Sequence, residues 1–229
     1  MNAKLIEYRD IAPKVRHFVF EVPDAERWQF TPGQWVSLTD TVGGKPLTRA
    51  YSVCSAPDGN RFELCLNRVE EGAFSPHLFG LRLGDEVPLE GPMGAFTLRD
   101  PIGDSMLVAT GTGIAPFRAM LRDPGTLASG RQFTLVLGAR YEHSLLYRDE
   151  FEALEVAHPN FRFVPVLSRP EPSWRGRVGR VQPHAMDLLG DRRDIDVYIC
   201  GLKEMVNQMR RLLQEAGFEK RRIVYEKYD

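Results

Sequence analysis

The first hundred residues show the apolar spacing of short β-strands. Residues 17–22 and 61–68 alternate apolar and polar side chains, which is typical of a strand with one face toward water. Pro, Gly and Asp turns separate segments rich in β-branched and aromatic residues, so we expect strands at 5–8, 15–22, 35–39, 49–54 and 62–69. This pattern predicts a small antiparallel β-barrel, because closing the sheet removes its exposed edges.

From about residue 102, apolar runs alternate with stretches of helical spacing. The runs expected to form buried strands are 106–109, 133–137, 161–167, 197–200 and 223–226, and the expected helices are 114–121, 148–157, 182–189 and 203–216. Alternating strands and helices predict an α/β domain: a parallel sheet with helices on both faces and a binding crevice at the carboxyl ends of its strands. We therefore predict a β-barrel domain in residues 1–100 and an α/β domain in residues 101–229.

The composition narrows the class of partner. The 229 residues are 43% hydrophobic and 27% charged, with a net charge of −1 and no basic tail, so nucleic acid is not expected. No apolar run approaches the roughly 20 residues that span a bilayer, and the polar N-terminus does not resemble a signal peptide. We expect a cytoplasmic monomer without a membrane partner.

The three cysteines, Cys54, Cys65 and Cys200, are widely separated and form no C-x-x-C pair. This argues against a disulfide framework and against a structural zinc site. A plant-type [2Fe–2S] cluster needs four cysteines, so this chain cannot hold one alone. The five histidines are scattered singly, and we expect no metal.

The stretch 106–117 predicts a strand, a glycine turn at Gly111-Thr112-Gly113, and a helix. This geometry points unpaired backbone N–H groups at a phosphate, with the partial positive charge of the helix N-terminus behind them. The match to G-x-G-x-x-G is incomplete, because Pro116 stands at the third glycine. An ordinary strand-to-helix turn is the alternative interpretation.

Two further segments suit a phosphorylated aromatic ligand. In the strand Arg49-Ala-Tyr-Ser52, Arg49 and Tyr51 share one face, so a guanidinium and an aromatic ring would lie beside a flavin and its phosphate. After Gly72, Ser75-Pro76 predicts an N-cap followed by proline at the first helical position. A half-exposed strand and a merely capped helix are the ordinary alternatives.

The position that selects the coenzyme is basic in this chain. NAD-binding folds place an acidic residue about 20 residues beyond the glycines, where it holds the ribose 2′-hydroxyl. Here the strand after Gly113 ends at Arg140, the next ends at Ser168-Arg169, and Arg180 follows. Any one of these arginines is ordinary on a surface, but together they predict a 2′-phosphate and therefore NADP.

Four motifs, taken in order along the chain, resemble the ferredoxin–NADP reductase superfamily. They are Arg49-Ala-Tyr-Ser52, Gly72-Ala-Phe-Ser75, Gly111-Thr-Gly-Ile-Ala-Pro116 and Cys200-Gly201. The resemblance covers essentially the whole chain. It is closest to the short bacterial ferredoxin/flavodoxin–NADP reductases, whose chains also end in Glu-x-Tyr, here Glu226-Lys-Tyr228.

The resemblance implies a role for individual residues. It implies that cofactors contact Arg49, Ala50, Tyr51, Ser52, Cys65, Asn67, Gly72, Ala73, Ser75, Thr112, Gly113, Arg140, Ser168, Arg169, Arg180 and Tyr228. It places Cys200, Glu226 and Ser52 where nicotinamide meets flavin, although a buried cysteine at a strand end is more often a packing residue. Many relatives end in an aromatic residue that covers the flavin or its adenine; here the end is Tyr228-Asp229, so Tyr228 takes that place or the flavin face is open.

The resemblance implies a flavoprotein oxidoreductase that transfers hydride between NADP(H) and FAD and single electrons to or from a ferredoxin or flavodoxin. That carrier must be a separate protein, because the chain holds no cluster. The alternatives are a reductase component of an oxygenase system, a free-flavin reductase, or a non-catalytic NADP- or redox-sensing regulator. The residues alone leave open the acceptor, the direction of electron flow, the choice of FAD over FMN, and the oligomeric state.

Overall fold

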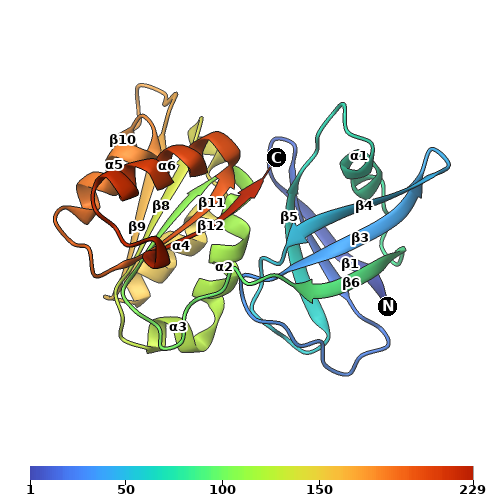
Figure 1. The fold of residues 1–229 in the computed structure, drawn as a ribbon. Coiled ribbons are helices and arrows are strands. Elements are labelled where there is room, and N and C mark those ends of the chain that lie inside the picture. The colour runs from blue at the N-terminus through green and yellow to red at the C-terminus, as the bar shows by residue number, and fades with distance from the viewer. Residues whose placement is uncertain (229) are drawn as a thin grey trace. The chain divides into compact units, whose positions relative to one another are not determined.

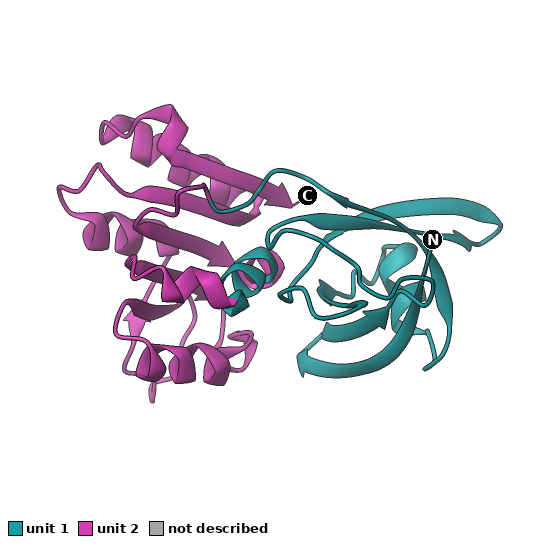
Figure 2. Cartoon of the chain, turned by 90° about the horizontal axis from the view of Figure 1, so that it is seen from below, with its two compact units in different colours: residues 1–98, 115–123 teal, residues 99–114, 124–229 magenta. Residues whose placement is uncertain are grey.

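The computed structural model describes residues 1–228, which form two compact units (Figure 1). Unit 1 comprises Met1–Leu98 and Ala115–Asp123, and unit 2 comprises Arg99–Ile114 and the chain from Pro124 onward (Figure 2). The expected boundary near residue 100 lies close to the division after Leu98. The pattern of apolar residues did not predict that helix α2, Ala115–Arg122, belongs to unit 1.

Unit 1 is built on an antiparallel sheet with the strand order β4-β3-β6-β1-β2-β5. Val53, directly after β4, pairs with Leu64 of β5, and the Cys54 N–H donates to the Glu63 carbonyl at 2.8 Å, so the two edge strands meet. The predicted antiparallel barrel is therefore confirmed. Its elements are β1 Asn2–Ala12, β2 Val15–Glu21, β3 Trp35–Val42, β4 Lys45–Ser52, β5 Arg61–Asn67, α1 Phe74–Phe79 and β6 Glu86–Met93.

Large apolar side chains from alternate strand positions fill the barrel. Phe18 and Phe20 of β2 point inward with Phe62 of β5, and the rings of Phe20 and Phe62 stack at 5.5 Å. His17 directly precedes Phe18 and therefore lies on the outward side of β2, yet it is only 3% exposed. A second, polar cluster is thus buried outside the barrel core.

Strand β6 is not among the strands expected from the sequence. In the structure Gly91–Met93 form the end of β6, and Pro88 and Pro92 within the strand hid it from a pattern search. Gly94 is needed for close packing, because a β-carbon there would lie 2.6 Å from the Trp35 indole.

Unit 2 is a parallel sheet with the order β10-β9-β8-β7-β11-β12 (Figure 1). Its strands are β7 Ser105–Thr110, β8 Phe133–Ala139, β9 Phe161–Leu167, β10 Arg177–Val178, β11 Asp196–Leu202 and β12 Ile223–Tyr228. The connecting helices are α3 Pro124–Ala128, α4 Arg148–Ala157, α5 Val181–Leu189 and α6 Lys203–Glu215, with short 3₁₀ turns at Gly111–Ile114, Glu142–Ser144 and Lys220–Arg222.

Helices cover both faces of this sheet, as predicted. Val164 and Val166 of β9 share one apolar cluster with residues of α5 and α6. Phe161 and Phe163 alternate with these valines and contact Phe151 of α4, so α4 lies on the opposite face. Within residues 1–228, no helix combines the length and apolar composition needed to cross a membrane.

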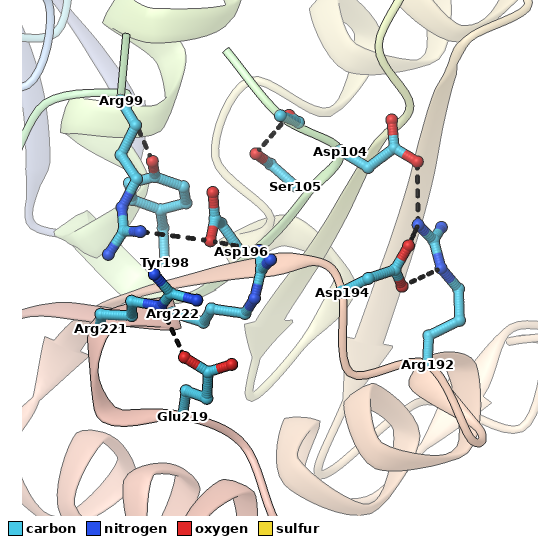
Figure 3. Close-up of polar contacts among 11 residues, drawn as sticks. Arg99, Asp104, Ser105, Arg192, Asp194, Asp196, Tyr198, Glu219, Arg221 and Arg222 are labelled. Carbon is cyan, nitrogen blue, oxygen red and sulfur yellow. Dashed lines mark hydrogen bonds and ion pairs between the residues drawn. The ribbon is translucent and has the colours of Figure 1, made fainter. Parts of the chain in front are cut away.

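A charged network joins the amino ends of these strands (Figure 3). Asp196, at the start of β11, is paired with Arg222 at 3.1 Å and with Arg99 at 3.6 Å, and its side chain is only 8% exposed. The Arg99 N–H also donates to the Tyr198 hydroxyl at 3.1 Å. This network ties the first residue of unit 2 and the start of the edge strand β12 to its neighbour β11.

We expect Asp196→Asn to lower the free energy of unfolding by about 1–3 kcal/mol, since it removes the carboxylate that balances two partly buried guanidinium groups. The matched control is Asp194→Asn, because the Asp194 side chain is 73% exposed and its pairing with Arg192 lies at the surface. That control should cost less than about 1 kcal/mol. Urea unfolding followed by circular dichroism checks both; equal losses in the two variants would contradict the structural role of Asp196.

Candidate functional site

Strand β4 ends in Arg49–Ser52, along which exposure falls from the exposed Arg49 and Ala50 to the buried Ser52. Tyr51 is half-buried and its ring stacks on Phe74 of α1, with centroids 6.4 Å apart and planes at 18°. Burial raises the pKa of the Tyr51 phenol to about 12, so it stays neutral. The exposed Arg49 donates to the Thr48 carbonyl at 2.8 Å, and none of residues 1–228 offers it a carboxylate. A cation and an aromatic ring are thus presented on one face.

The start of α1 corrects the predicted N-cap. The helix begins at Phe74 with Ala73 as its N-cap residue, so Ser75 lies inside the first turn. The Ser75 hydroxyl accepts a hydrogen bond from the Val69 N–H at 2.9 Å, which closes the preceding turn and uses the oxygen that a cap would need. Gly72 packs tightly in this turn, because a β-carbon there would lie 3.2 Å from Val69.

The other residues predicted in unit 1 occupy separate positions. Ser52 is buried and pairs with Trp35 across β3 and β4. Cys65 is buried opposite His17, and Asn67 is exposed at the end of β5. Ala50 and Ala73 are exposed. Their contact with a cofactor stays a prediction.

In unit 2 the glycine turn lies directly against strand β11. Gly111 has φ +55°, which favours glycine, and a β-carbon at Gly113 would lie 2.4 Å from the Cys200 carbonyl oxygen. Thr112 is half-buried between them. Pro116 occupies the first turn of α2, where proline is tolerated because no helical N–H is needed there. The turn therefore needs its two glycines and not a third.

Sequence reasoning did not single out Thr110, the last residue of β7. Its hydroxyl oxygen is buried, and no described atom hydrogen-bonds it. Buried polar atoms are normally satisfied, so this one points to a ligand at the turn. The only sequence signal was its place directly before Gly111.

The carboxyl ends of β8 and β9 bring the predicted coenzyme residues together. The Arg169 N–H donates to the Arg140 carbonyl at 2.9 Å, and the Ser168 N–H donates to the Ala139 carbonyl at 3.0 Å. Arg180 is the N-cap residue of α5, whose next residue, Val181, covers Gly138 of β8. Three arginines from three segments thus lie at one edge of the sheet.

These arginines differ from their neighbours in having no carboxylate partner. Arg140, Arg169 and Arg180 are exposed, and none forms an ion pair with the part of the chain that the structure describes. Nearby, Arg148 pairs with Glu142 and Glu152, and Arg177 pairs with Asp187. Cations clustered without acidic partners suit an incoming anion.

Cys200 of β11 lies in register with Glu226 of β12. Burial raises the pKa of the Cys200 thiol far above its usual range, and the nearby Glu226 carboxylate raises it further. A hydrogen bond with the Tyr228 side chain acts in the opposite direction and lowers this pKa by less. The thiol therefore stays protonated at neutral pH, which does not suit a nucleophile. Tyr228 lies beside Cys200. Asp229, which ends the chain after Tyr228, lies outside the described residues.

The comparisons with known proteins match this arrangement. A family model described as an oxidoreductase FAD-binding domain matches residues 2–98, and one described as an oxidoreductase NAD-binding domain matches residues 107–211. The chain is 40% identical to ferredoxin–NADP reductase B of Sorangium cellulosum, over all of this chain and 97% of that protein. The chain belongs to the ferredoxin–NADP reductase family.

A solved structure and a further sequence relative are also similar to this chain. A ferredoxin NADP⁺ reductase from Neisseria gonorrhoeae, solved with bound FAD and NADP, is 26% identical with a TM-score of 0.85, over 99% of this chain and 98% of that one. The chain is also 32% identical to NADH-cytochrome b5 reductase 1 of Laccaria bicolor, over 91% of this chain and 70% of that protein. Family membership therefore shows a flavoprotein oxidoreductase with FAD- and NAD(P)-binding domains, and leaves the choice of coenzyme to the residues.

The residues of the two units fit both cofactors, the flavin and the nicotinamide dinucleotide. A flavin phosphate suits the exposed Arg49, and the flavin ring suits the face that carries Tyr51. A dinucleotide suits the glycine turn, with the buried Thr110 hydroxyl beside it.

We expect Arg49→Ala to weaken FAD binding about 10- to 100-fold, the loss of one charge-assisted hydrogen bond to phosphate. The control is Arg61→Ala, an exposed arginine at the start of β5 outside the predicted site. Equilibrium dialysis of the folded apoproteins against FAD measures both. Wild-type affinity in Arg49→Ala would remove Arg49 from the flavin site.

Proposed function

We propose that this chain is an NADPH-dependent reductase that exchanges single electrons with a separate ferredoxin or flavodoxin. The observation that carries the choice of coenzyme is the unpaired set Arg140, Arg169 and Arg180 at the carboxyl edge of the unit 2 sheet. A 2′-phosphate carries about two negative charges, which these guanidinium groups can bind in bidentate fashion. Relatives named for NADP and for NADH both occur, so this local charge is the feature that discriminates.

The need for a separate carrier follows from the cysteines. Cys54, Cys65 and Cys200 are buried and form no disulfide, and four thiolates would be needed for a plant-type cluster. The similarity to a protein named ferredoxin–NADP reductase supports a small electron carrier as partner.

The residues of this chain would bind the flavin and the nicotinamide coenzyme, orient them and exclude water from them. When bound, the flavin accepts the hydride given up by the nicotinamide and releases electrons singly. The backbone N–H groups at Gly111–Gly113 receive the pyrophosphate, and Arg169 holds the 2′-phosphate away from the reacting end. The neutral Cys200 thiol and the Glu226 carboxylate line the place proposed for nicotinamide, where they position the ring without taking its electrons.

We expect Arg169→Ala to raise KM for NADPH about tenfold or more, to leave NADH nearly unaffected and to change kcat little. The matched control is Arg162→Ala, an exposed arginine at the other end of β9. The preference for NADPH over NADH should also decrease as the salt concentration rises, because the arginines of the site are exposed. Steady-state kcat/KM for both coenzymes tests this; equal wild-type values, or equal losses with both coenzymes, would exclude a role in reading the 2′-phosphate.

We expect Cys200→Ser and Glu226→Gln each to slow flavin reduction at saturating NADPH by about tenfold or more, while NADPH affinity changes little. Because the thiol is protonated throughout, the wild-type rate should show no step between pH 7 and 9 from thiolate formation. Glu215→Gln on the exposed side of α6 is the control. Stopped-flow measurement of unchanged limiting rates in both site variants would move the reacting centre elsewhere.

A further inference from the structure

Arg118 of α2 is a buried charge that the proposed chemistry does not use. Its side chain is 3% exposed, and its Nη1 atom donates to the Cys54 carbonyl oxygen at 2.8 Å and pairs with the Glu63 carboxylate. Helix α2, Cys54 and Glu63 all belong to unit 1. Burying a guanidinium in a low-dielectric interior is strongly disfavoured unless hydrogen-bond and charge partners compensate it. Arg118 is therefore buried because the Cys54 carbonyl and the Glu63 carboxylate bind it.

His17 completes the cluster on the outward side of the barrel. Its Nε2 atom lies 3.6 Å from the same Glu63 carboxylate oxygen. Burial is the main cause that lowers the pKa of His17 to about 4, and the positive charges of Arg118 and other arginines lower it as well. The negative charge of Glu63 raises this pKa but does not offset the burial. His17 is therefore neutral at physiological pH, and the Arg118 charge balances Glu63.

The cluster contains ligand types that suit a metal, but an arginine already fills it. A ring nitrogen of His17, Cys54 Sγ and a Glu63 carboxylate oxygen lie within 4.8 Å of one another. Arg118 Nη1 is paired with that carboxylate and lies 4.0 Å from the Cys54 sulfur. A dication would have to displace a buried guanidinium from its partner, so we assign the cluster to Arg118.

The backbone oxygen that Arg118 binds belongs to Cys54, close to the segment Arg49–Ser52 that is predicted to contact the flavin. Cys54 follows Ser52 by two residues, and its N–H is already bonded to the Glu63 carbonyl where the barrel closes. Arg118 binds the carbonyl of the same residue, so both backbone polar groups of Cys54 are held. Arg118 is also five residues beyond Gly113, in the helix into which the glycine turn continues.

We propose that Arg118 is a positioning residue for hydride transfer, acting through the Cys54 backbone and the start of α2. By binding the Cys54 carbonyl, it holds the end of the strand that carries Tyr51 and Ser52 to the helix that begins directly after the glycine turn. Transfer between two bound groups is sensitive to displacements on the order of 1 Å, so a loosened connection reduces the rate more than it reduces binding. The inference rests on the family's flavin and dinucleotide functions and does not depend on NADPH over NADH.

The test compares two variants that both lack the buried ion pair. Glu63→Gln keeps the Arg118 bond to the Cys54 carbonyl, whereas the double variant Arg118→Met with Glu63→Gln loses it. In the FAD-loaded proteins, stopped-flow reduction should give a limiting rate within about twofold of wild type for Glu63→Gln and at least about tenfold lower for the double variant. The Kd for NADPH should stay within about twofold in both.

The control is Arg16→Met, which removes a similarly bonded arginine of unit 1. Arg16 donates to the Phe79 carbonyl at 3.0 Å and pairs with Asp10 at 2.7 Å. It should lower stability and leave the limiting rate within about twofold of wild type. This separates a general loss of stability from a loss of positioning.

A double variant that loses stability but keeps the wild-type limiting rate would overturn the proposal, as would an equal loss of rate in Glu63→Gln. Should the double variant fail to fold, Arg118→Met alone, which also lacks the bond to the Cys54 carbonyl, is measured in its place, and an unchanged limiting rate there would likewise overturn the role. Wild-type protein that neither coenzyme reduces would instead contradict the family function on which the proposal rests.

Discussion

The contact on which the dinucleotide site depends is the approach of the glycine turn to strand β11. A β-carbon at Gly113 would lie 2.4 Å from the Cys200 carbonyl oxygen, and one at Gly201 would lie 2.5 Å from the Thr110 hydroxyl. Glycines on both sides let two backbone segments pack without side chains between them. The turn's N–H groups and the Cys200 thiol are therefore brought to the same edge of the sheet, as a bound dinucleotide requires.

Charge is distributed differently at the two edges of the unit 2 sheet. At the amino edge Asp196 balances Arg222 and Arg99, which stabilises the unit. At the carboxyl edge Arg140 and Arg169 have no carboxylate partner among residues 1–228, and we propose that they bind an external anion. The same residue type thus stabilises the structure at one edge and is proposed to bind a ligand at the other, and the difference is the presence of a carboxylate partner.

The sequence predicted unit 2 well because buried parallel strands leave continuous apolar runs, as in β7 and β9. The antiparallel barrel was predicted from alternation, but β6 was missed, since its prolines carry the signal of a turn. Ser75 looked like an N-cap because the sequence cannot show that Val69 takes its hydroxyl. The arginines at strand ends could be listed from spacing, whereas the lack of partners that distinguishes them needed coordinates.

The least predictable feature was the place of α2. Apolar periodicity gave the helix, but nothing local shows that Arg118 is buried against Cys54 and Glu63, residues about 60 positions away. Contacts between residues so distant in sequence leave no pattern in a single chain, and a buried arginine looks like any surface arginine until its partners are known.

The most direct test of the account is anaerobic mixing of the purified flavoprotein with one equivalent of NADPH, followed by oxidised ferredoxin or flavodoxin. The account predicts that the flavin absorbance bleaches with NADPH and returns as the carrier becomes reduced. Protein that binds flavin but keeps its absorbance with NADPH, or that bleaches but passes no electrons to either carrier, would contradict it.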